Sequence, residues 1–177
     1  CKETKSIQWK DTGRISSVSG TETTKKGAEM KKKLIFATGN EGKMKEVREI
    51  LADSGYEILS MKEAGVDLEI VEDGTTFEEN ALIKARAVME ATGELTLADD
   101  SGLEIDAFDG GPGVYSSRYL GEDTPYTEKN QIILDKMKDV PEQERTARFV
   151  CVIAAIFPDG QTYTTRGTME GIIGYEA

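Results

Sequence analysis

The stretch Leu34-Ile35-Phe36-Ala37-Thr38-Gly39-Asn40-Glu41-Gly42-Lys43 runs from an apolar segment through a glycine-containing turn into the start of a helix. Its first four residues are apolar, as in a strand that is buried within a sheet. Asn40 is a suitable N-cap for the helix, which is predicted from Lys43 to Ala52. The apolar stripe of this helix consists of Met44, Val47, Ile50 and Leu51. A helix with one such stripe lies on a sheet, so the stretch predicts the first strand–helix unit of an α/β fold.

Further strands are indicated along the chain. Extended segments are predicted at residues 56–59, 68–71 and 145–157, and the last of these is apolar on both faces from its fifth residue onward, as in a central strand. A Pro-Asp-Gly turn at 158–160 leads into a final strand that ends at Thr168.

Helical patterns lie between these strands. Thr76 and Glu79 form a capping box in front of a second helix. Its apolar stripe consists of Phe77, Ala81, Ala85, Val88 and Met89. A short helix is predicted at 114–119, and a Thr-Pro pair at 124–125 opens another that reaches Lys138. The alternation of strands and helices predicts a layered α/β fold.

The run Leu97-Ala98-Asp99-Asp100-Ser101-Gly102-Leu103 places two carboxylates and a hydroxyl beside an apolar segment. Asp and Gly are depleted inside strands, so we expect this run where a strand ends in a turn. Neighbouring strand residues point to opposite faces, so only one of Asp99 and Asp100 leads into a cleft. A metal ion and a phosphate group are the expected ligands. The alternative is an Asx-type turn with solvated acids.

The turn at residues 38–43 is a predicted phosphate loop. Backbone N–H groups in such a turn point at an anion, and the positive end of the helix dipole adds to the attraction. It is not a Walker A loop, because Ala37 replaces the first glycine and Met44 replaces the final hydroxyl residue. The alternative is an ordinary capped turn between a strand and a helix.

Asn80 and Lys84 lie four residues apart on the second predicted helix, so an amide and an ammonium share one face. Two interpretations are open. Both side chains reach a ligand, or they form a solvated edge of the helix.

Histidine is absent from all 177 residues, which excludes histidine bases, Ser-His-Asp triads and His-ligated zinc within this chain. Acid–base and metal chemistry must therefore use carboxylates. The net charge of −11 disfavours binding to a nucleic-acid backbone, and no apolar stretch is long enough to span a membrane. Neither nucleic acid nor a membrane is a predicted partner, and a polyphosphate ligand needs a cation as intermediary.

Two cysteines, Cys1 and Cys151, are too few for a disulfide framework. Cys151 lies within the apolar run 149–157, which predicts a buried free thiol. A reducing cytoplasm fits this cysteine usage.

Residues 1–30 differ from the rest of the chain. They carry six Lys and Arg against four Asp and Glu and lack apolar periodicity, so we predict a disordered segment or a fused remnant. The domain itself is predicted to span residues 31–177.

Four blocks of sequence together resemble the inosine triphosphate pyrophosphatase family. They are Ala37-Thr38-Gly39-Asn40-Glu41-Gly42-Lys43, Thr76-Phe77-Glu78-Glu79-Asn80-Ala81-Leu82-Ile83-Lys84-Ala85, Ala98-Asp99-Asp100-Ser101-Gly102-Leu103 and Gly111-Pro112-Gly113-Val114-Tyr115-Ser116-Ser117-Arg118-Tyr119. The resemblance implies a mixed, curved central sheet flanked by helices, with a cleft between two lobes. It also implies metal-dependent hydrolysis of aberrant purine nucleoside triphosphates (ITP, dITP and XTP) to the monophosphate and pyrophosphate, by a cytoplasmic homodimer.

The resemblance assigns roles to particular residues. The triphosphate would be bound by Thr38, Gly39, Asn40, Glu41, Gly42 and Lys43, with Lys84 and Ser101 also touching substrate. Glu72 matches a metal-binding acid, and Asp100 matches the proton acceptor and a second metal contact, while Asp99 has a supporting role. The implied metal is Mg²⁺, with Mn²⁺ as a substitute. Mg²⁺ takes one or two carboxylates together with waters and phosphate oxygens, which agrees with this pair of acids.

The sequence departs from the family in one respect. The Gly-Phe-Gly-Tyr-Asp base-pocket motif and the Ser-His-Arg motif are not found in it, so the domain is predicted to lack its C-terminal section. One alternative is therefore a nucleotide-binding module without turnover. Another is a structural or interaction protein whose acidic turns are only turns. A phosphatase of the aspartyl-phosphate type is disfavoured, because Asp99-Asp100-Ser101 is not a D-x-D pair.

Overall fold

The computed structural model describes residues 31–121 and 123–176. The predictions for residues 1–30 lie outside this part of the chain. None of the helices in the described part has the length and apolar character that crossing a bilayer requires.

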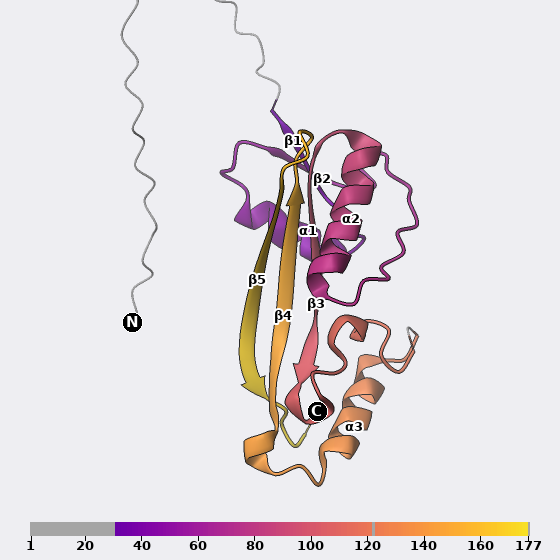
Figure 1. Cartoon of the computed structure of the whole chain (residues 1–177), viewed down its shortest axis with the longest axis vertical. Helices are drawn as coiled ribbons and strands as arrows, with labels where there is room; N and C mark the ends of the chain where they lie inside the picture. Colours follow the sequence, from indigo (N-terminus) through magenta and orange to yellow (C-terminus); the bar gives the residue numbers. More distant parts are fainter. Residues whose placement is uncertain (1–30, 122, 177) are drawn as a thin grey trace, which may run out of the picture. The chain divides into compact units, whose positions relative to one another are not determined.

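Five strands form one mixed sheet in the described part of the chain. They are β1 (Lys33–Phe36), β2 (Glu57–Ser60), β3 (Leu95–Ile105), β4 (Thr146–Ile156) and β5 (Thr162–Ile172). The helices are α1 (Glu41–Ile50), α2 (Phe77–Thr92) and α3 (Tyr126–Met137), and short 3-10 turns occur at η1 (Asp106–Phe108), η2 (Gly113–Tyr115) and η3 (Glu142–Glu144). The strand order is β2-β1-β3-β4-β5 (Figure 1). β1 runs parallel to both β2 and β3, whereas β4 runs antiparallel to both β3 and β5. The predicted α/β fold with a mixed sheet is confirmed.

The starts of α1 and α2 are set by side-chain caps. The Asn40 Oδ1 atom accepts a hydrogen bond from the backbone N–H of Lys43 at 3.1 Å. Thr76 and Glu79 form the predicted capping box, and Gly93 ends α2 in the left-handed conformation (φ 69°). Both predicted caps are confirmed, because a cap depends only on residues within one turn of the chain. Helix α1 itself begins at Glu41 and ends at Ile50, two residues earlier at each end than predicted.

One hydrophobic core lies between α2 and the sheet. Its buried residues are Ile35, Ala37, Phe77, Ala81, Ala85, Val88, Ala98, Val150, Val152, Ala154 and Ile156. The predicted stripe of α2 thus faces the sheet. On α1, Met44 is buried but Ile50 is 79% exposed, so the last turn of α1 is not covered by the described part of the chain.

The other face of β4 is open around Phe149 and Cys151 in the part of the chain that the structure describes. Phe149 is 57% exposed and Cys151 is exposed, so the prediction of a buried thiol is wrong. Side chains alternate along a strand, and only the even-numbered residues of β4 face α2. The apolar run placed β4 correctly in the interior of the sheet, but it could not show which face a helix covers.

Three further predictions require correction. Residues 68–71 belong to no strand, and they form part of an irregular connection between β2 and α2. Helix α3 begins at Tyr126, and the hydroxyl of Thr124 donates to the Leu120 carbonyl instead of capping the helix. The final strand β5 extends beyond Thr168 to Ile172, because β4 pairs with it along its whole length.

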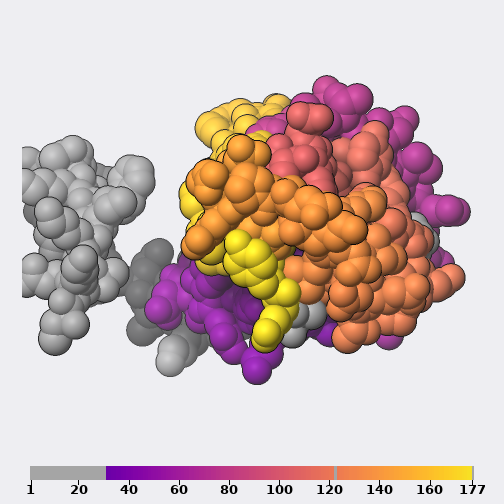
Figure 2. Space-filling model, turned by 90° about the horizontal axis from the view of Figure 1, so that it is seen from below, coloured from indigo at the N-terminus to yellow at the C-terminus, as the bar shows by residue number. Residues whose placement is uncertain are grey.

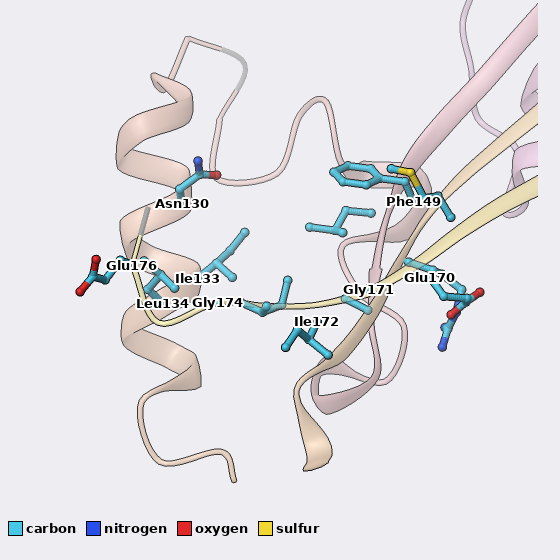
Figure 3. A pocket seen from close by; sticks show the side chains of 14 residues that line it. Asn130, Ile133, Leu134, Phe149, Glu170, Gly171, Ile172, Gly174 and Glu176 are labelled. Atoms are coloured by element: carbon cyan, nitrogen blue, oxygen red, sulfur yellow. The ribbon is translucent and has the colours of Figure 1, made fainter. Parts of the chain in front are cut away.

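A second, smaller core lies at the other end of the long strands, under α3. It consists of Ile105, Ile133, Met137 and Ala147. Beside it, an apolar cavity of about 380 Å³ opens between α3 and the ends of β4 and β5 (Figure 3). The run Asp99–Gly102 on β3 therefore lies between two separate cores, one that ends at Ala98 and one that involves Leu103 and Ile105.

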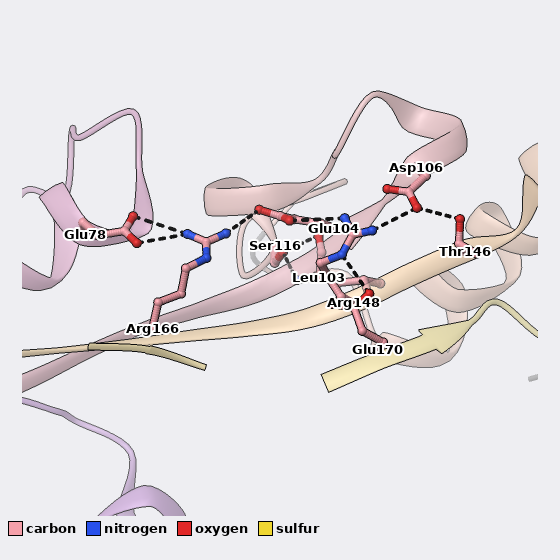
Figure 4. A network of polar contacts seen from close by, with 9 residues as sticks. All are labelled: Glu78, Leu103, Glu104, Asp106, Ser116, Thr146, Arg148, Arg166 and Glu170. Carbon is pink, nitrogen blue, oxygen red and sulfur yellow. Dashed lines mark hydrogen bonds and ion pairs between the residues drawn. The ribbon is translucent and has the colours of Figure 1, made fainter. Parts of the chain in front are cut away.

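Two arginines cross-link the strands by ion pairs (Figure 4). Arg166 of β5 contacts Glu78 in the first turn of α2 at 3.0 Å and Glu104 of β3 at 3.2 Å. Arg148 of β4 contacts Glu104 at 3.5 Å. Its other partners are Asp106 and Glu170. These groups are partly exposed, so each pair contributes little to stability, but together they connect the start of α2 with β3 and β5.

Arg145 is a buried cation whose partners are backbone carbonyls. Its guanidinium donates to the carbonyls of Met137 at 2.5 Å, Ile173 at 2.9 Å and Gly174 at 2.6 Å. These bonds hold the end of α3 against the segment that follows β5. Seen from this end, the yellow C-terminal residues lie beside the orange α3 region (Figure 2).

We expect Arg145→Leu to lower the free energy of unfolding by on the order of 3 kcal/mol, because it removes the buried guanidinium that bonds three backbone carbonyls. Urea unfolding followed by circular dichroism measures this loss. The control is Arg86→Leu on the exposed face of α2, which should change stability by no more than about 0.5 kcal/mol. Equal effects of the two substitutions would contradict this role of Arg145.

Candidate active site

The run Asp99–Gly102 lies within β3 and not in a turn at its end, so that prediction is wrong. Pairing with β4 holds this run in an extended conformation, since Asp99 to Gly102 face Ile153 to Val150 in the antiparallel ladder. Glycine is required at position 102, because a Cβ there would collide with the Gly113 carbonyl and the Ser116 hydroxyl. Strand composition alone does not reveal such distant partners.

The same run nevertheless lies at an open edge. On its other side β3 pairs with β1 only as far as Phe36 and Leu97. Beyond this point the chain leaves β1 toward α1 and β2 on one side, while β3 lies on the other. Ligands of α/β proteins bind where neighbouring connections diverge in this way, outside the carboxyl ends of the parallel strands.

Asp99 and Ser101 share one face of β3 with Lys43. The Lys43 ammonium lies 2.5 Å from Asp99 Oδ2, and the Ser101 hydroxyl donates to the same oxygen at 2.9 Å. The Asp99 side chain is 5% exposed, whereas Lys43 is 41% exposed. Asp99 thus holds the lysine at a defined place while leaving its ammonium accessible.

Asp100 points to the opposite face, toward α2. Its Oδ2 accepts a hydrogen bond from the Asn80 amide at 3.2 Å, and its Oδ1 accepts one from the backbone N–H of Ser101 at 3.0 Å. Burial raises the pKa of the Asp100 carboxyl above its usual value, and the negative charge of Glu72 acts in the same direction. The amide of Asn80 and the ammonium of Lys84 partly offset this increase in pKa. The predicted division of the two aspartates between the faces is confirmed.

Glu72 and Lys84 complete this second group. The Lys84 ammonium lies 3.0 Å from Glu72 Oε2 and donates to the Asp99 carbonyl at 3.0 Å. Lys84 therefore reaches from α2 to the open edge of β3. The structure brings Glu72, Lys84 and Asp100 together on one side of this edge, and Lys43 and Ser101 on the other.

The loop at residues 38–43 presents backbone donors. Thr38 Oγ1 accepts from the N–H of Asn40, and Asn40 caps the helix. Within the described part of the chain, the N–H groups of Gly39, Glu41 and Gly42 donate to no protein acceptor. Free N–H groups at a helix N-terminus form an anion site. The residues from Thr38 to Glu41 also line a cavity of about 240 Å³ between the ends of β1 and β2.

The donor set suits a metal that needs few protein ligands. Among residues 31–121 and 123–176, no three acidic or cysteine side chains cluster as a metal cage. The carboxylates of Glu72 and Asp100 are near enough for the charge of Glu72 to raise the pKa of Asp100, and the Lys84 ammonium contacts Glu72. Mg²⁺ is held by one or two carboxylates, waters and phosphate oxygens, so these residues fit it.

Residues 34–177 match the sequence model of the Ham1 family. The chain belongs to the Ham1 family. A dITP/XTP pyrophosphatase of Desulforamulus reducens is 50% identical to it over 141 residues, which cover 80% of this chain and 70% of that protein. A dITP/XTP pyrophosphatase of Bacillus subtilis is 46% identical over 145 residues, covering 82% and 73%. The similarity to inosine triphosphate pyrophosphatases is thereby confirmed.

Solved structures of Ham1 proteins share the fold. The Staphylococcus aureus Ham1 protein superposes with a TM-score of 0.75 at 37% identity, over 82% of this chain and 73% of that one. A HAM1 protein from Coxiella burnetii gives a TM-score of 0.76 at 37% identity, over 82% and 74%.

Sequence reasoning did not assign two residues that contact this Ham1-family site. Asn80 is 1% exposed and bonds Asp100, so the interpretation as a solvated edge of the helix is wrong for this residue. The spacing of Asn80 and Lys84 was the signal, but it did not reveal what the amide contacts. Arg118 donates to the Glu72 carbonyl at 3.3 Å from a distant loop, and the sequence holds no local signal for this contact.

Proposed function

We propose that this chain hydrolyses dITP, ITP and XTP to the nucleoside monophosphate and pyrophosphate. The observation that carries the proposal is the convergence of two lysines and two carboxylates at the open edge of β3, beside free N–H groups of a helix N-terminus. The relatives named dITP/XTP pyrophosphatase support the choice of substrate.

The reaction assigns a task to each group. A water oxygen bonds to the α-phosphorus as the bond from that phosphorus to the bridging oxygen breaks, and pyrophosphate leaves with the electron pair. Asp100 accepts the proton of the water. Lys43 and Lys84 stabilise the negative charge that moves to the leaving group. The 38–43 loop and Ser101 bind and orient the triphosphate.

Glu72 and Asp100 are the proposed ligands of Mg²⁺, for which Mn²⁺ would substitute. When bound, the ion supplies positive charge to the phosphate oxygens and lowers the pKa of a bound water. The Lys84 ammonium contacts Glu72 and the Asp99 carbonyl, and its positive charge favours the ionised form of Asp100, so it offsets part of the repulsion between the two carboxylates. Asp99 acts by orienting Lys43.

Pyrophosphate release from dITP tests the proposal. We expect release by the 177-residue chain in Mg²⁺ or Mn²⁺, and none in excess EDTA, because an acidic chain needs a cation to bind a polyanion. Glu72→Gln should weaken metal binding while leaving the melting temperature nearly unchanged. Strong release in EDTA, or normal turnover by Glu72→Gln, would contradict the two-carboxylate site. Binding of dITP without release would favour a nucleotide-binding module, and no change of melting temperature with dITP would favour an interaction protein.

The homodimer and the cytoplasmic location stay predictions. Light scattering on the purified chain measures the first, and fractionation of cells measures the second.

A further inference from the structure

The segment that carries Glu72 is not held by regular secondary structure. In the part of the chain that the structure describes, residues 67–75 make no backbone–backbone hydrogen bond. Side chains of other elements hold this segment instead. They are Asn80, Glu79 and Lys84 of α2, together with Arg118. The position of the Glu72 carboxylate therefore depends on these contacts.

Asn80 is the contact that also reaches Asp100. Its Oδ1 accepts from the backbone N–H of Gly74 at 2.8 Å, and its Nδ2 donates to Asp100 Oδ2 at 3.2 Å. A carboxylate only accepts and a backbone N–H only donates, so the amide has a single orientation. With 1% of its surface exposed, the side chain has no room to turn away.

The absence of a side chain at Gly74 allows its backbone to lie directly against Asn80. A Cβ on Gly74 would lie 2.7 Å from Asn80 Oδ1 and 2.7 Å from Glu79 Cβ, which is too near for either atom. The backbone at Gly74 thus packs directly on the first turns of α2. One helical turn beyond Asn80, the Lys84 ammonium holds the carboxylate of Glu72.

We propose that Asn80 is a positioning residue that sets the spacing between the Asp100 and Glu72 carboxylates. It joins Asp100 on β3 to the backbone two residues after Glu72, so both carboxylates keep their places relative to one rigid helix. The inference rests on the proposed function, in which these two carboxylates hold the metal ion.

Mn²⁺ affinity of the nucleotide-free chain, measured by calorimetry, tests this role. We expect Asn80→Ala to weaken Mn²⁺ binding by about 10–100-fold, the usual effect of losing a group that orients a metal ligand. Gly74→Ala should have a similar effect although it removes no polar group, because its Cβ would push the Gly74 backbone away from Asn80. The double variant Asn80→Ala/Gly74→Ala should bind Mn²⁺ no more weakly than the single variant with the lower affinity, since both changes break the same connection. Asn130→Ala, an exposed asparagine on α3, is the matched control and should bind Mn²⁺ as the wild type does.

Three results would overturn the inference. They are unchanged Mn²⁺ affinity in folded Asn80→Ala, unchanged affinity in Gly74→Ala, and losses that add in the double variant. A lower melting temperature with unchanged affinity would show that Asn80 has only a structural role. Glu72→Gln and Asp100→Asn separate this failure from that of the proposed site. If those two variants bind Mn²⁺ normally, the metal site itself is wrong. If they lose affinity while the Asn80 and Gly74 variants do not, only the positioning role fails.

Discussion

Replacement of Asp100 by asparagine is expected to lower the rate of pyrophosphate release from dITP by about two to four orders of magnitude. The substitution keeps the side-chain volume but removes the proton acceptor and one negative charge from the proposed metal site. The rate at saturating dITP and Mg²⁺ measures the effect. Circular dichroism and the melting temperature show whether the variant is folded.

Asp99→Asn is the matched comparison on the neighbouring residue. Asp99 faces the other side of β3 and contacts Lys43, so we expect a smaller loss of rate and a weaker affinity for triphosphate. A larger loss of rate in Asp99→Asn than in Asp100→Asn would show that the proton acceptor lies on the opposite face of the strand.

Lys43→Ala is expected to cost about 2–5 kcal/mol of triphosphate binding, as when other hydrogen-bonded charge pairs are broken. Binding of deoxyinosine monophosphate should suffer less, because the free N–H groups at the start of α1 still hold one phosphate. Calorimetry with the monophosphate and a nonhydrolysable α,β-methylene analogue of dITP measures both. Equal losses for the two ligands, or none, would contradict the assignment of Lys43 to the polyphosphate.

The pairing of Lys43 with Asp99 requires two controls. Loss of the lysine leaves a buried carboxylate without its cation, which lowers stability independently of any ligand. In the double variant Lys43→Ala/Asp99→Asn this unpaired charge is gone, so stability should recover while the triphosphate affinity stays low. Lys45→Ala, an exposed neighbour on α1, should leave both quantities unchanged. Recovery of affinity in the double variant would mean that Lys43 acts only through folding.

Several features of the fold followed from local sequence. The strand and helix around residues 34–50, the Asn40 cap and the Thr76–Glu79 capping box depend on apolar periodicity and on hydrogen bonds within one helical turn. Such interactions are complete within a few residues, so their pattern is visible in the sequence. The apolar stripe of α2 was correct for the same reason.

The errors share a different physical origin. The local sequence predicts a turn at residues 99–102, because Asp and Gly disfavour strands. Pairing with residues 150–153 of β4 nevertheless keeps them extended. The apolar neighbours of Cys151 predict a buried thiol. Helix α2 covers only one face of β4, however, and Cys151 lies on the other face. In both cases a partner that is distant in sequence outweighs the local preference.

The sequence by itself determined that Asp99 and Asp100 point to opposite faces, because side chains alternate along any strand. Only the tertiary structure decided what each carboxylate meets. Lys43 reaches Asp99 across 56 positions of sequence, and Asn80 reaches Asp100 across 20. Those contacts exist because α1 and α2 bring these side chains to opposite faces of β3, beside the point where β3 loses its β1 neighbour. The residue types thus determine which chemistry the site can perform, but the packing of helices on strands determines its geometry.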